Sequence, residues 1–222
     1  MPFILKSKIS AHSSLGVWHI TESEEELRKS LRPDAAEKHY FSGFRNELRK
    51  NQGLACRLII RELTGDPGIA VHYDKSGKPC LNNPALHISI SHAGRFAAAC
   101  LSDETPVGID IELLKERISR VAERFLTDEE MDRIREPGRL EKLYVHWSAK
   151  EALYKYYGGE LEDFQYGINL DPFDYLCSGI GSLTAKVRLK GTIRTHLLNY
   201  LKISGSMLVY TVGSSDTNEN RT

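Results

Sequence analysis

Apolar positions in the first part of the chain recur with the spacing of helices. Residues 21–25 combine capping side chains with acids suited to a first turn, so a helix is predicted to begin there. The region from 22 to about 63 has a mainly helical pattern, with a longer helix predicted near 46–63. Thr64-Gly65-Asp66-Pro67-Gly68 combines glycine and proline and ends this region.

A second helical region is predicted at residues 119–158, with a break at Pro137-Gly138. Within it, Thr127 is followed by Asp128, Glu129 and Glu130, which is the pattern of a capped helix start. Apolar residues follow at helical spacing up to Gly158.

Extended segments alternate apolar and polar residues with period two. Residues 87–101 are interpreted as two strands around a break at Ser91–Arg95, and Asp103–Pro106 as the next turn. The other predicted strands are 69–73 and 107–112, and the region 182–212 returns to strand-like alternation, seen at 183–189 and 208–212.

Helix-rich and strand-rich stretches thus occur on both sides of Pro106, which favours an α+β fold with two lobes of similar size. We expect one lobe at residues 1–106 and the other at 107–212. Residues 213–222 are polar throughout and are predicted to form a disordered tail.

Composition excludes several classes of function. The 222 residues carry 30 basic and 30 acidic side chains, a balance that argues against a general nucleic-acid binder. No segment has the length and apolar content of a membrane span or a signal peptide. The four cysteines are widely scattered and form no C-x-x-C or Cys/His cluster, which argues against a zinc site. A cytoplasmic protein without a membrane or nucleic-acid partner is expected.

Candidate chemistry is concentrated in two motifs. In Gly108-Ile109-Asp110-Ile111-Glu112, alternation along a strand puts Asp110 and Glu112 on one face. In the helix that contains Trp147-Ser148-Ala149-Lys150-Glu151, the side chains of Glu151 and Lys155 lie one turn apart. Three converging carboxylates would suit Mg²⁺. The alternative is a solvated strand face and an ordinary helix-surface ion pair.

Other polar residues could hold a phosphate group. Ser91-His92 lies where a strand meets a turn, Lys78 lies in the turn Gly77-Lys78-Pro79, and Arg49 lies on a helix. Each also has a simpler interpretation, as a structural histidine, a solvated loop lysine or an exposed helix face. The sequence contains no phosphate-binding P-loop, no dinucleotide-binding glycine pattern and no G-x-S-x-G motif.

In order and spacing, these motifs resemble the 4'-phosphopantetheinyl transferase superfamily, and specifically its longer single-chain, surfactin-synthetase-activating class. The resemblance covers about residues 45–158. It is carried by five segments: Gly77-Lys78-Pro79, Ile88-Ser89-Ile90-Ser91-His92, Val107–Glu112, Phe125–Glu130 and Trp147–Lys155.

The resemblance implies two pseudo-symmetric lobes, each a small antiparallel sheet packed with helices, and a site at the lobe interface of a monomer. It also implies an activity. A member of the family transfers the 4'-phosphopantetheine of coenzyme A to a serine of an apo acyl or peptidyl carrier protein. The reaction depends on Mg²⁺ and releases adenosine 3',5'-bisphosphate.

By position, the resemblance implies that Asp110, Glu112 and Glu151 bind Mg²⁺ on the coenzyme A pyrophosphate. Lys155, and with it Lys150, would contact that pyrophosphate or assist proton movement. The catalytic candidates are Glu151 and Lys155. Either Glu151 itself or a Mg²⁺-bound water that it orients would take the proton of the carrier serine.

The same resemblance assigns Lys78, Ser91 and His92 to the 3'-phosphate and adenine end of coenzyme A. Arg49 and Arg57 are assigned to coenzyme A because the family often has arginine on this helix. The family often has serine after the Ser-His pair, where this chain has alanine. We also expect a basic or mixed docking surface for the carrier beside the site.

Two other functions compete with this hypothesis. A catalytically silent module that binds coenzyme A or a carrier protein would be favoured by loss of an acidic ligand or of Lys155, and all of them are present. A Mg²⁺-dependent nucleotide enzyme such as a pyrophosphate hydrolase would need a longer acidic signature or a phosphate loop, and the sequence has neither.

Overall fold

A computed structural model describes residues 3–134, 137–158, 160–161 and 163–213. The longest helices are α3 and α5, and short 3-10 turns η1 and η2 precede α4. The bounds of the helical elements are α1 Glu24–Leu31, α2 Ala35–Ser42, α3 Glu47–Thr64, η1 Glu116–Arg120, η2 Ala122–Arg124, α4 Asp128–Arg133 and α5 Arg139–Tyr157.

The strands form two larger antiparallel sheets and one small hairpin. The four-stranded sheet has the order β1-β2-β6-β5, with bounds β1 Phe3–Lys8, β2 Ser13–His19, β5 His87–Ala93 and β6 Phe96–Ser102. The five-stranded sheet has the order β7-β11-β10-β9-β8, with bounds β7 Val107–Leu113, β8 Ile168–Leu170, β9 Ile180–Leu189, β10 Thr192–Ile203 and β11 Ser206–Val212. The hairpin consists of β3 Val71–Tyr73 and β4 Pro79–Leu81.

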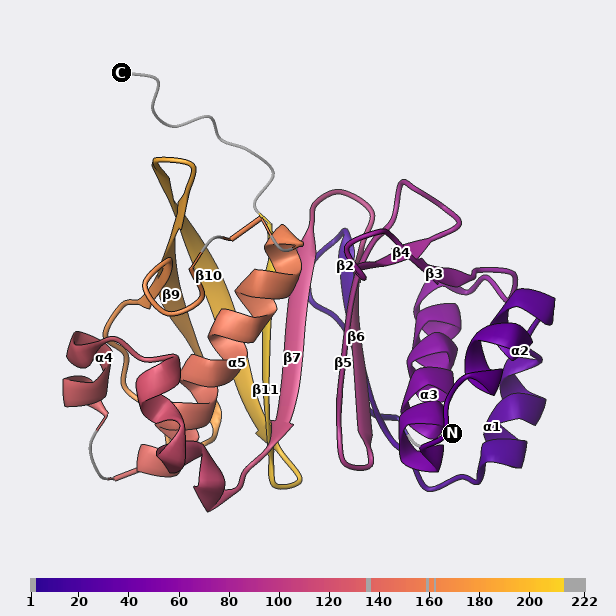
Figure 1. The fold of residues 1–222 in the computed structure, drawn as a ribbon, viewed down its shortest axis with the longest axis horizontal. Helices are drawn as coiled ribbons and strands as arrows, with labels where there is room; N and C mark the ends of the chain where they lie inside the picture. The colour runs from indigo at the N-terminus through magenta and orange to yellow at the C-terminus, as the bar shows by residue number, and fades with distance from the viewer. Residues whose placement is uncertain (1–2, 135–136, 159, 162, 214–222) are drawn as a thin grey trace.

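Figure 1 shows the two larger sheets side by side in the middle of the molecule, between two groups of helices. α1, α2 and α3 lie beside the four-stranded sheet, and α5 crosses the five-stranded sheet on the other side. The edge strands β5 and β7 meet between them. Ser89 Oγ accepts a hydrogen bond from the backbone N–H of Ile109 at 3.0 Å, so side chains of β5 satisfy the free edge of β7.

The core follows this layering. Ala97 and Ala99 of β6 face α3, whereas Ala98 and Cys100 face the five-stranded sheet, so β6 is buried on both sides. Small side chains let the layers approach closely. Gly16 of β2 has the same role, because a Cβ atom there would lie 2.6 Å from Ile59 of α3. A third apolar cluster joins α5 to the five-stranded sheet.

The predicted α+β class, with antiparallel sheets packed with helices, is confirmed. The predicted longer helix is α3, which begins after Asn46, whose Oδ1 accepts the N–H of Arg49 at 3.0 Å. The helix predicted to start at Thr127 is α4. Its N-terminus is a capping box, in which Glu130 Oε2 accepts the N–H of Thr127 at 3.0 Å. Residues 116–124 form 3-10 turns, where an α-helix had been predicted from 119.

The predicted break at Ser91–Arg95 is wrong in position. β5 continues to Ala93, which pairs with Phe96, so only Gly94 and Arg95 form the turn. Ser91 and His92 are therefore strand residues, held by the backbone ladder to β6 rather than by a loop. Strands β1, β2, β4 and β8 had not been predicted.

The predicted disordered tail lies outside the described residues from 214 onward. Among the helices formed by the described residues, none combines the length and apolar content needed to cross a membrane.

Candidate active site

A glycine brings β7 and α5 into close contact. A Cβ atom on Gly108 would lie 2.0 Å from the backbone oxygen of Ala152, so only glycine lets α5 pack this closely. Asp110 lies two residues further along β7 and points to the same face. It therefore meets the turn of α5 that carries Lys155.

Asp110 is the centre of a hydrogen-bonded group that joins β5, β7 and α5. Its Oδ1 accepts hydrogen bonds from Lys155 Nζ at 2.7 Å and from Ser91 Oγ at 2.8 Å. Lys155 Nζ also donates to Ser91 Oγ at 3.0 Å and to the backbone oxygen of Ile109 at 3.1 Å. Ser91 Oγ accepts the N–H of Ile111 at 3.2 Å, so this hydroxyl donates once and accepts twice, which uses its full capacity.

The second oxygen of Asp110 has no partner. The residue is only 4% exposed, and its Oδ2 is buried without a hydrogen bond among the described residues. A buried carboxylate oxygen with no donor is costly unless a cation or another donor reaches it. The atom therefore marks a place where a ligand would lower the free energy of the folded chain.

Two further carboxylates share the electrostatic field of Asp110. Burial, and after it the negative charges of Asp110 and Glu112, raise the pKa of Glu151 to about 7, against the lowering effect of Lys155. Burial and then Asp110 also raise the pKa of Glu112. The charges of these three carboxylates, two on β7 and one on α5, therefore act on one another.

The donor set suits a hard divalent cation. Asp110, Glu112 and Glu151 offer carboxylate oxygens, and one of these oxygens is buried without a partner. Within the described ranges, however, three or more His, Cys, Asp or Glu side chains are nowhere gathered tightly enough to form a ready-made metal centre. At Asp110 Oδ1, the neighbouring cation in this structure is the ammonium of Lys155.

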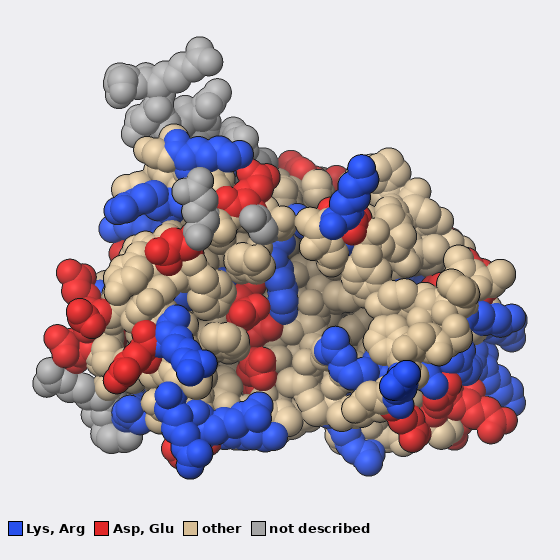
Figure 2. Space-filling model, viewed as in Figure 1, with Lys and Arg blue, Asp and Glu red and all other residues tan. Residues whose placement is uncertain are grey.

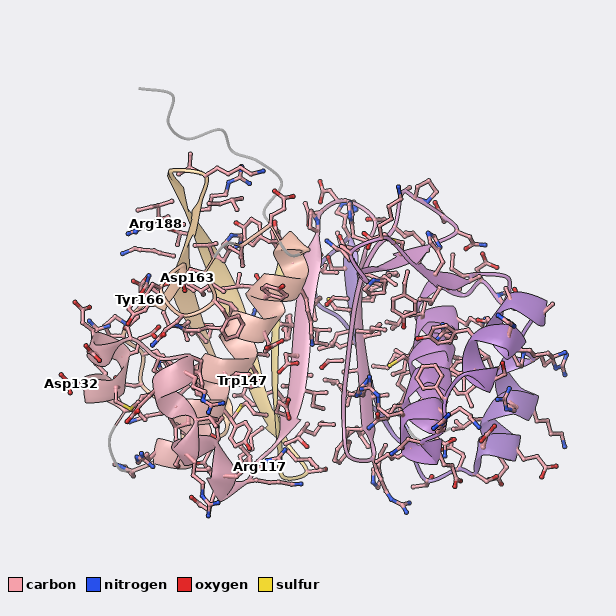
Figure 3. The ribbon with its side chains drawn as sticks, viewed as in Figure 1. Arg117, Asp132, Trp147, Asp163, Tyr166 and Arg188 are labelled. Atoms are coloured by element: carbon pink, nitrogen blue, oxygen red, sulfur yellow. The ribbon has the colours of Figure 1, made fainter. Side chains whose placement is uncertain are left out.

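Trp147 orients one of these carboxylates, a role that the sequence analysis had not assigned to it. Its side chain donates a hydrogen bond to Glu112, which lowers the pKa of that carboxyl group. Its ring packs edge-on against Phe125 and also contacts Phe164, with ring centres 5.2 and 5.7 Å apart. Figure 3 shows Trp147 on α5, with Arg117 nearer the lower end of β7. The signal in the sequence was its position one turn before Glu151.

A cavity of about 560 Å³ adjoins this group and has a basic wall. Arg49, Lys78, His92 and Lys155 all line it. Arg49 Nη1 lies 2.9 Å from His92 Nε2, and since an arginine nitrogen can only donate, His92 Nε2 is the acceptor. Burial and then the charge of Arg49 lower the pKa of His92, which favours this neutral form.

The turn between β3 and β4 holds Lys78 at the cavity. Asp74 Oδ1 accepts the backbone N–H groups of Ser76 and Lys78 at 2.8 and 2.9 Å, which stabilises the turn. Lys78 Nζ then donates to the backbone oxygen of Tyr156 at 3.2 Å, across to the C-terminal end of α5. The lysine that the sequence placed in a turn thus points toward the other half of the molecule.

Aromatic side chains form another part of the cavity wall, and the sequence analysis had not singled them out. Tyr40 of α2 stacks on Tyr73 of β3, with ring centres 5.4 Å apart and planes 18° apart. Phe44 packs edge-on against Tyr40 at 5.1 Å. All three line the cavity. They belong to separate local elements, and no spacing in the sequence links Tyr73 to the other two.

Lys150 is not part of this site. Its side chain is fully buried, and its Nζ lies 2.8 Å from Glu130 Oε2 and 2.8 Å from the backbone oxygen of Gln165. Glu130 also accepts the backbone N–H of Leu170 at 3.0 Å. The predicted contact of Lys150 with a pyrophosphate does not fit this placement, because α5 points the side chain into the core that joins α4 and β8.

Arg57 likewise faces away from the cavity. It is 2% exposed and forms an ion pair with Glu37 at 3.4 Å, between α3 and α2. Its guanidinium lies 4.7 Å from the ring centres of Tyr40 and of Phe41. The predicted contact with coenzyme A does not fit this position. Arg57 supports the aromatic wall from behind.

The charges gather where the two sheets meet. Figure 2 shows acidic groups in the hollow between the two halves of the molecule, with basic groups on both sides of it. The structure therefore brings together Asp110, Ser91 and Lys155 by direct contact. It places Lys78, Arg49 and His92 on the adjoining cavity wall.

Comparison with known proteins identifies relatives of this arrangement. Residues 106–198, which include β7 and α5, match the model of the 4'-phosphopantetheinyl transferase superfamily. A region of 119 residues, 51% of this chain, is 36% identical to the 4'-phosphopantetheinyl transferase psf-1 of Bacillus pumilus and covers 49% of it.

Two further relatives carry the same activity in their names. The 4'-phosphopantetheinyl transferase Sfp of Bacillus subtilis strain 168 is 37% identical over 86 residues, which are 37% of this chain and 38% of Sfp. The 4'-phosphopantetheinyl transferase AcpT of Escherichia coli K12 is 32% identical over 117 residues, which are 50% of this chain and 60% of AcpT. The matches span about half the length of psf-1 and less than two thirds of the other two.

Proposed function

Because this chain belongs to the 4'-phosphopantetheinyl transferase superfamily, we propose that it transfers the 4'-phosphopantetheine of coenzyme A to a serine of an apo acyl or peptidyl carrier protein. The products are the holo carrier protein and adenosine 3',5'-bisphosphate. One observation carries this proposal: Ser91, Asp110 and Lys155 meet at the edge of a cavity with a basic wall. The arrangement can hold a pyrophosphate beside an acidic group that accepts a proton.

The cavity wall supports coenzyme A as the donor substrate. Arg49, Lys78 and His92 offer N–H donors for the 3'-phosphate, and phosphate prefers such partners. The stacked rings of Tyr40 and Tyr73 offer a flat apolar surface for the adenine. The volume of about 560 Å³ falls in the usual range for a small-molecule site.

Asp110, Glu112 and Glu151 are the residues that we propose for Mg²⁺. When bound, the ion would offset negative charge on the phosphate oxygens in the transition state. Asp110 would bind through its unpartnered Oδ2, and the N–H of Trp147 would keep the carboxylate of Glu112 oriented. The position of Lys155 beside these carboxylates lets it contact the pyrophosphate as well.

Glu151 is the residue that we propose for proton removal. Either its carboxylate or a Mg²⁺-bound water that it orients would accept the proton of the carrier serine. The serine oxygen attacks the β-phosphorus of coenzyme A and forms the new P–O bond, while the bond to the leaving phosphate oxygen breaks. Lys155 would donate hydrogen bonds to the phosphate oxygens as this charge shifts.

We propose that the carrier docks beside the site on the 3-10 turns. Arg117, Arg120 and Arg124 are exposed there, and Arg117 lies close enough to Glu112 to lower the pKa of its carboxyl group. Basic side chains suit an acidic carrier. We also propose a monomer with a lobe boundary at residues 106–107, because one chain supplies the β5, β7 and α5 residues of the site.

The test is an incubation of the purified protein with coenzyme A, Mg²⁺ and an apo acyl carrier protein, followed by mass spectrometry of the carrier. The expected result is a mass gain of one phosphopantetheine, which a chelator prevents and added Mg²⁺ restores. Asp110→Asn should give no gain under the same conditions. If several apo carriers gain no mass while coenzyme A still binds, the chain is a silent binding module.

A further inference from the structure

The ammonium group of Lys155 is bound to oxygen atoms beside the carboxylate of Asp110, although the residue also lines the cavity. Its Nζ has three oxygen partners within 3.1 Å, namely Asp110 Oδ1, Ser91 Oγ and the backbone oxygen of Ile109. If the sole role of Lys155 were to bind a phosphate group, its ammonium group would be expected to extend into the cavity, toward solvent. Lys155 instead turns toward a carboxylate that is itself 95% or more buried, since Asp110 is 4% exposed.

The charges around this contact do not balance. Asp110, Glu112 and Glu151 offer up to three negative charges, whereas Arg117 acts on Glu112 and Lys155 acts on both glutamates. Lys155 reaches Oδ1 of Asp110 and leaves Oδ2 buried without a partner. A second positive charge at this place would therefore be favourable, and it would compete with Lys155 for the same carboxylate.

We propose that Lys155 is an exchangeable internal cation, which neutralises Asp110 until a divalent cation takes its place and is then released to an anionic ligand in the cavity. The geometry allows this exchange. Lys155 is 28% exposed at its side chain, and the same residue lines the basic cavity together with Arg49 and Lys78. A rotation of its flexible side chain moves the ammonium from one partner to the other without movement of α5.

The exchange couples two binding events. A divalent cation at Asp110 repels Lys155 toward the cavity, where it strengthens the binding of phosphate groups. An anionic ligand in the cavity attracts Lys155 away from Asp110, which opens that carboxylate to the cation. Each ligand therefore tightens the binding of the other by the same factor. This part rests on the proposed function, because it takes coenzyme A as the anionic ligand.

The first test measures Mn²⁺ binding to the protein without any nucleotide, by the electron paramagnetic resonance signal of free Mn²⁺. Lys155→Met keeps the length of the side chain and removes the charge, so we expect Mn²⁺ to bind about tenfold more tightly. Lys155→Arg keeps the charge and should retain the weak binding of the wild type. Lys78→Met removes a charge from the same cavity wall, away from Asp110, and should change the affinity little.

A wild-type measurement guards against misfolding of the variant. Lys155 should react slowly with an amine-acylating reagent in the metal-free protein and faster after Mg²⁺ is added, by peptide mass spectrometry. Exposed Lys38 of α2 provides the internal reference. Unchanged or slower labelling of Lys155 with Mg²⁺ would overturn the proposal, as would Mn²⁺ binding that Lys155→Met leaves equal or weaker.

Coenzyme A provides the second arm. It should tighten Mn²⁺ binding to the wild type by a larger factor than it does for Lys155→Met, because the variant has no internal cation to displace. An equal factor in both proteins would contradict the coupling. Failure of phosphopantetheine transfer in the mass assay would instead contradict the proposed function, and it would leave the nucleotide-free Mn²⁺ result unaffected.

Discussion

Ser91 on β5 donates a hydrogen bond to Asp110 on β7, and the two atoms are 2.8 Å apart. The donor belongs to the edge of the four-stranded sheet and the acceptor to the edge of the five-stranded sheet. One hydroxyl thus joins the two sheets at the carboxylate on which the proposed chemistry depends. The arrangement links the rigidity of the sheet interface to the geometry of the site.

Replacement of Ser91 by alanine should weaken both the interface between the two sheets and the arrangement of the site. It removes the hydrogen bond to a buried carboxylate and leaves the N–H of Ile111 without its acceptor, which should lower the free energy of unfolding by about 1–3 kcal/mol. Denaturant unfolding measures this loss. Transfer to an apo carrier should fall as well.

Ser89→Ala is the matched control for Ser91→Ala. Ser89, on the same strand as Ser91, accepts the N–H of Ile109 at 3.0 Å but makes no hydrogen bond to a carboxylate among the described residues. Its loss should reduce stability by a similar amount and leave transfer close to the wild-type rate. A parallel loss of activity in both variants would show that the interface, rather than the Ser91–Asp110 contact, sets the rate.

Gly108→Ala should separate α5 from β7. The added Cβ atom would lie 2.0 Å from the backbone oxygen of Ala152, and a backbone atom can move only with its helix. We expect a loss of about 3 kcal/mol or more, at the upper end for overpacking, and an inactive protein. Gly43→Ala is the control, because the nearest atom there is 3.6 Å away. Thermal unfolding of both variants tests this, and equal stability would show that α5 can shift at no cost.

Lys150→Met should destabilise the protein without affecting coenzyme A binding by the folded fraction. It leaves the carboxylate of Glu130 buried and unpaired, which costs about 3–5 kcal/mol. The double variant Lys150→Met with Glu130→Gln should recover part of that stability. Unfolding curves and the KM for coenzyme A separate the two effects. A raised KM in a stably folded variant would restore Lys150 to the site.

Local signals made much of this fold predictable. The caps at Ser23 and Thr127, and the period-two alternation around Asp110, each act over a few residues and can be interpreted without knowledge of the rest of the chain. Ser91 and His92 were assigned to a turn because Gly94 lies close behind them. The hairpin proved tighter, and pairing with β6 carried the strand through both residues.

The remaining features depend on contacts between distant segments. Lys150 belongs to the same helix motif as Glu151, but the direction of its side chain is set by the ion pair with Glu130 of α4. Arg57 was assigned to coenzyme A because of its position on α3, yet its ion pair with Glu37 of α2 holds the side chain in the core. Tyr73 meets Tyr40 only after β3 folds against α2. No single-sequence pattern records such long-range pairings.

His92→Ala should affect the recognition of one phosphate. His92 and Arg49 lie 2.9 Å apart on the cavity wall, so loss of the imidazole removes a donor and frees Arg49 from its partner. If this pair contacts the 3'-phosphate, the KM should rise about tenfold for coenzyme A and much less for 3'-dephospho-coenzyme A. Steady-state kinetics with both substrates tests the assignment. Equal rises would place His92 against another part of the substrate.

His146 should make the protein sensitive to acid. Burial lowers the pKa of its imidazole from 6.5 to about 4, while Nδ1 lies 2.8 Å from the backbone oxygen of Lys142. The unfolded chain therefore takes up a proton below pH 6.5 that the folded chain refuses until about pH 4. The stability that the neutral imidazole contributes is complete above this window and is lost as the pH falls through it, by about 3 kcal/mol in total.

His146→Gln keeps a side-chain N–H donor and removes this titration. Its free energy of unfolding should fall less steeply than that of the wild type as the pH is lowered between 6.5 and about 4. His39→Gln, at an exposed position of α2, should leave the wild-type slope unchanged. Urea unfolding at a series of pH values gives the slopes directly. If His146→Gln and the wild type show the same pH dependence, the imidazole takes up its proton at the same pH in the folded and the unfolded chain, which would contradict the prediction.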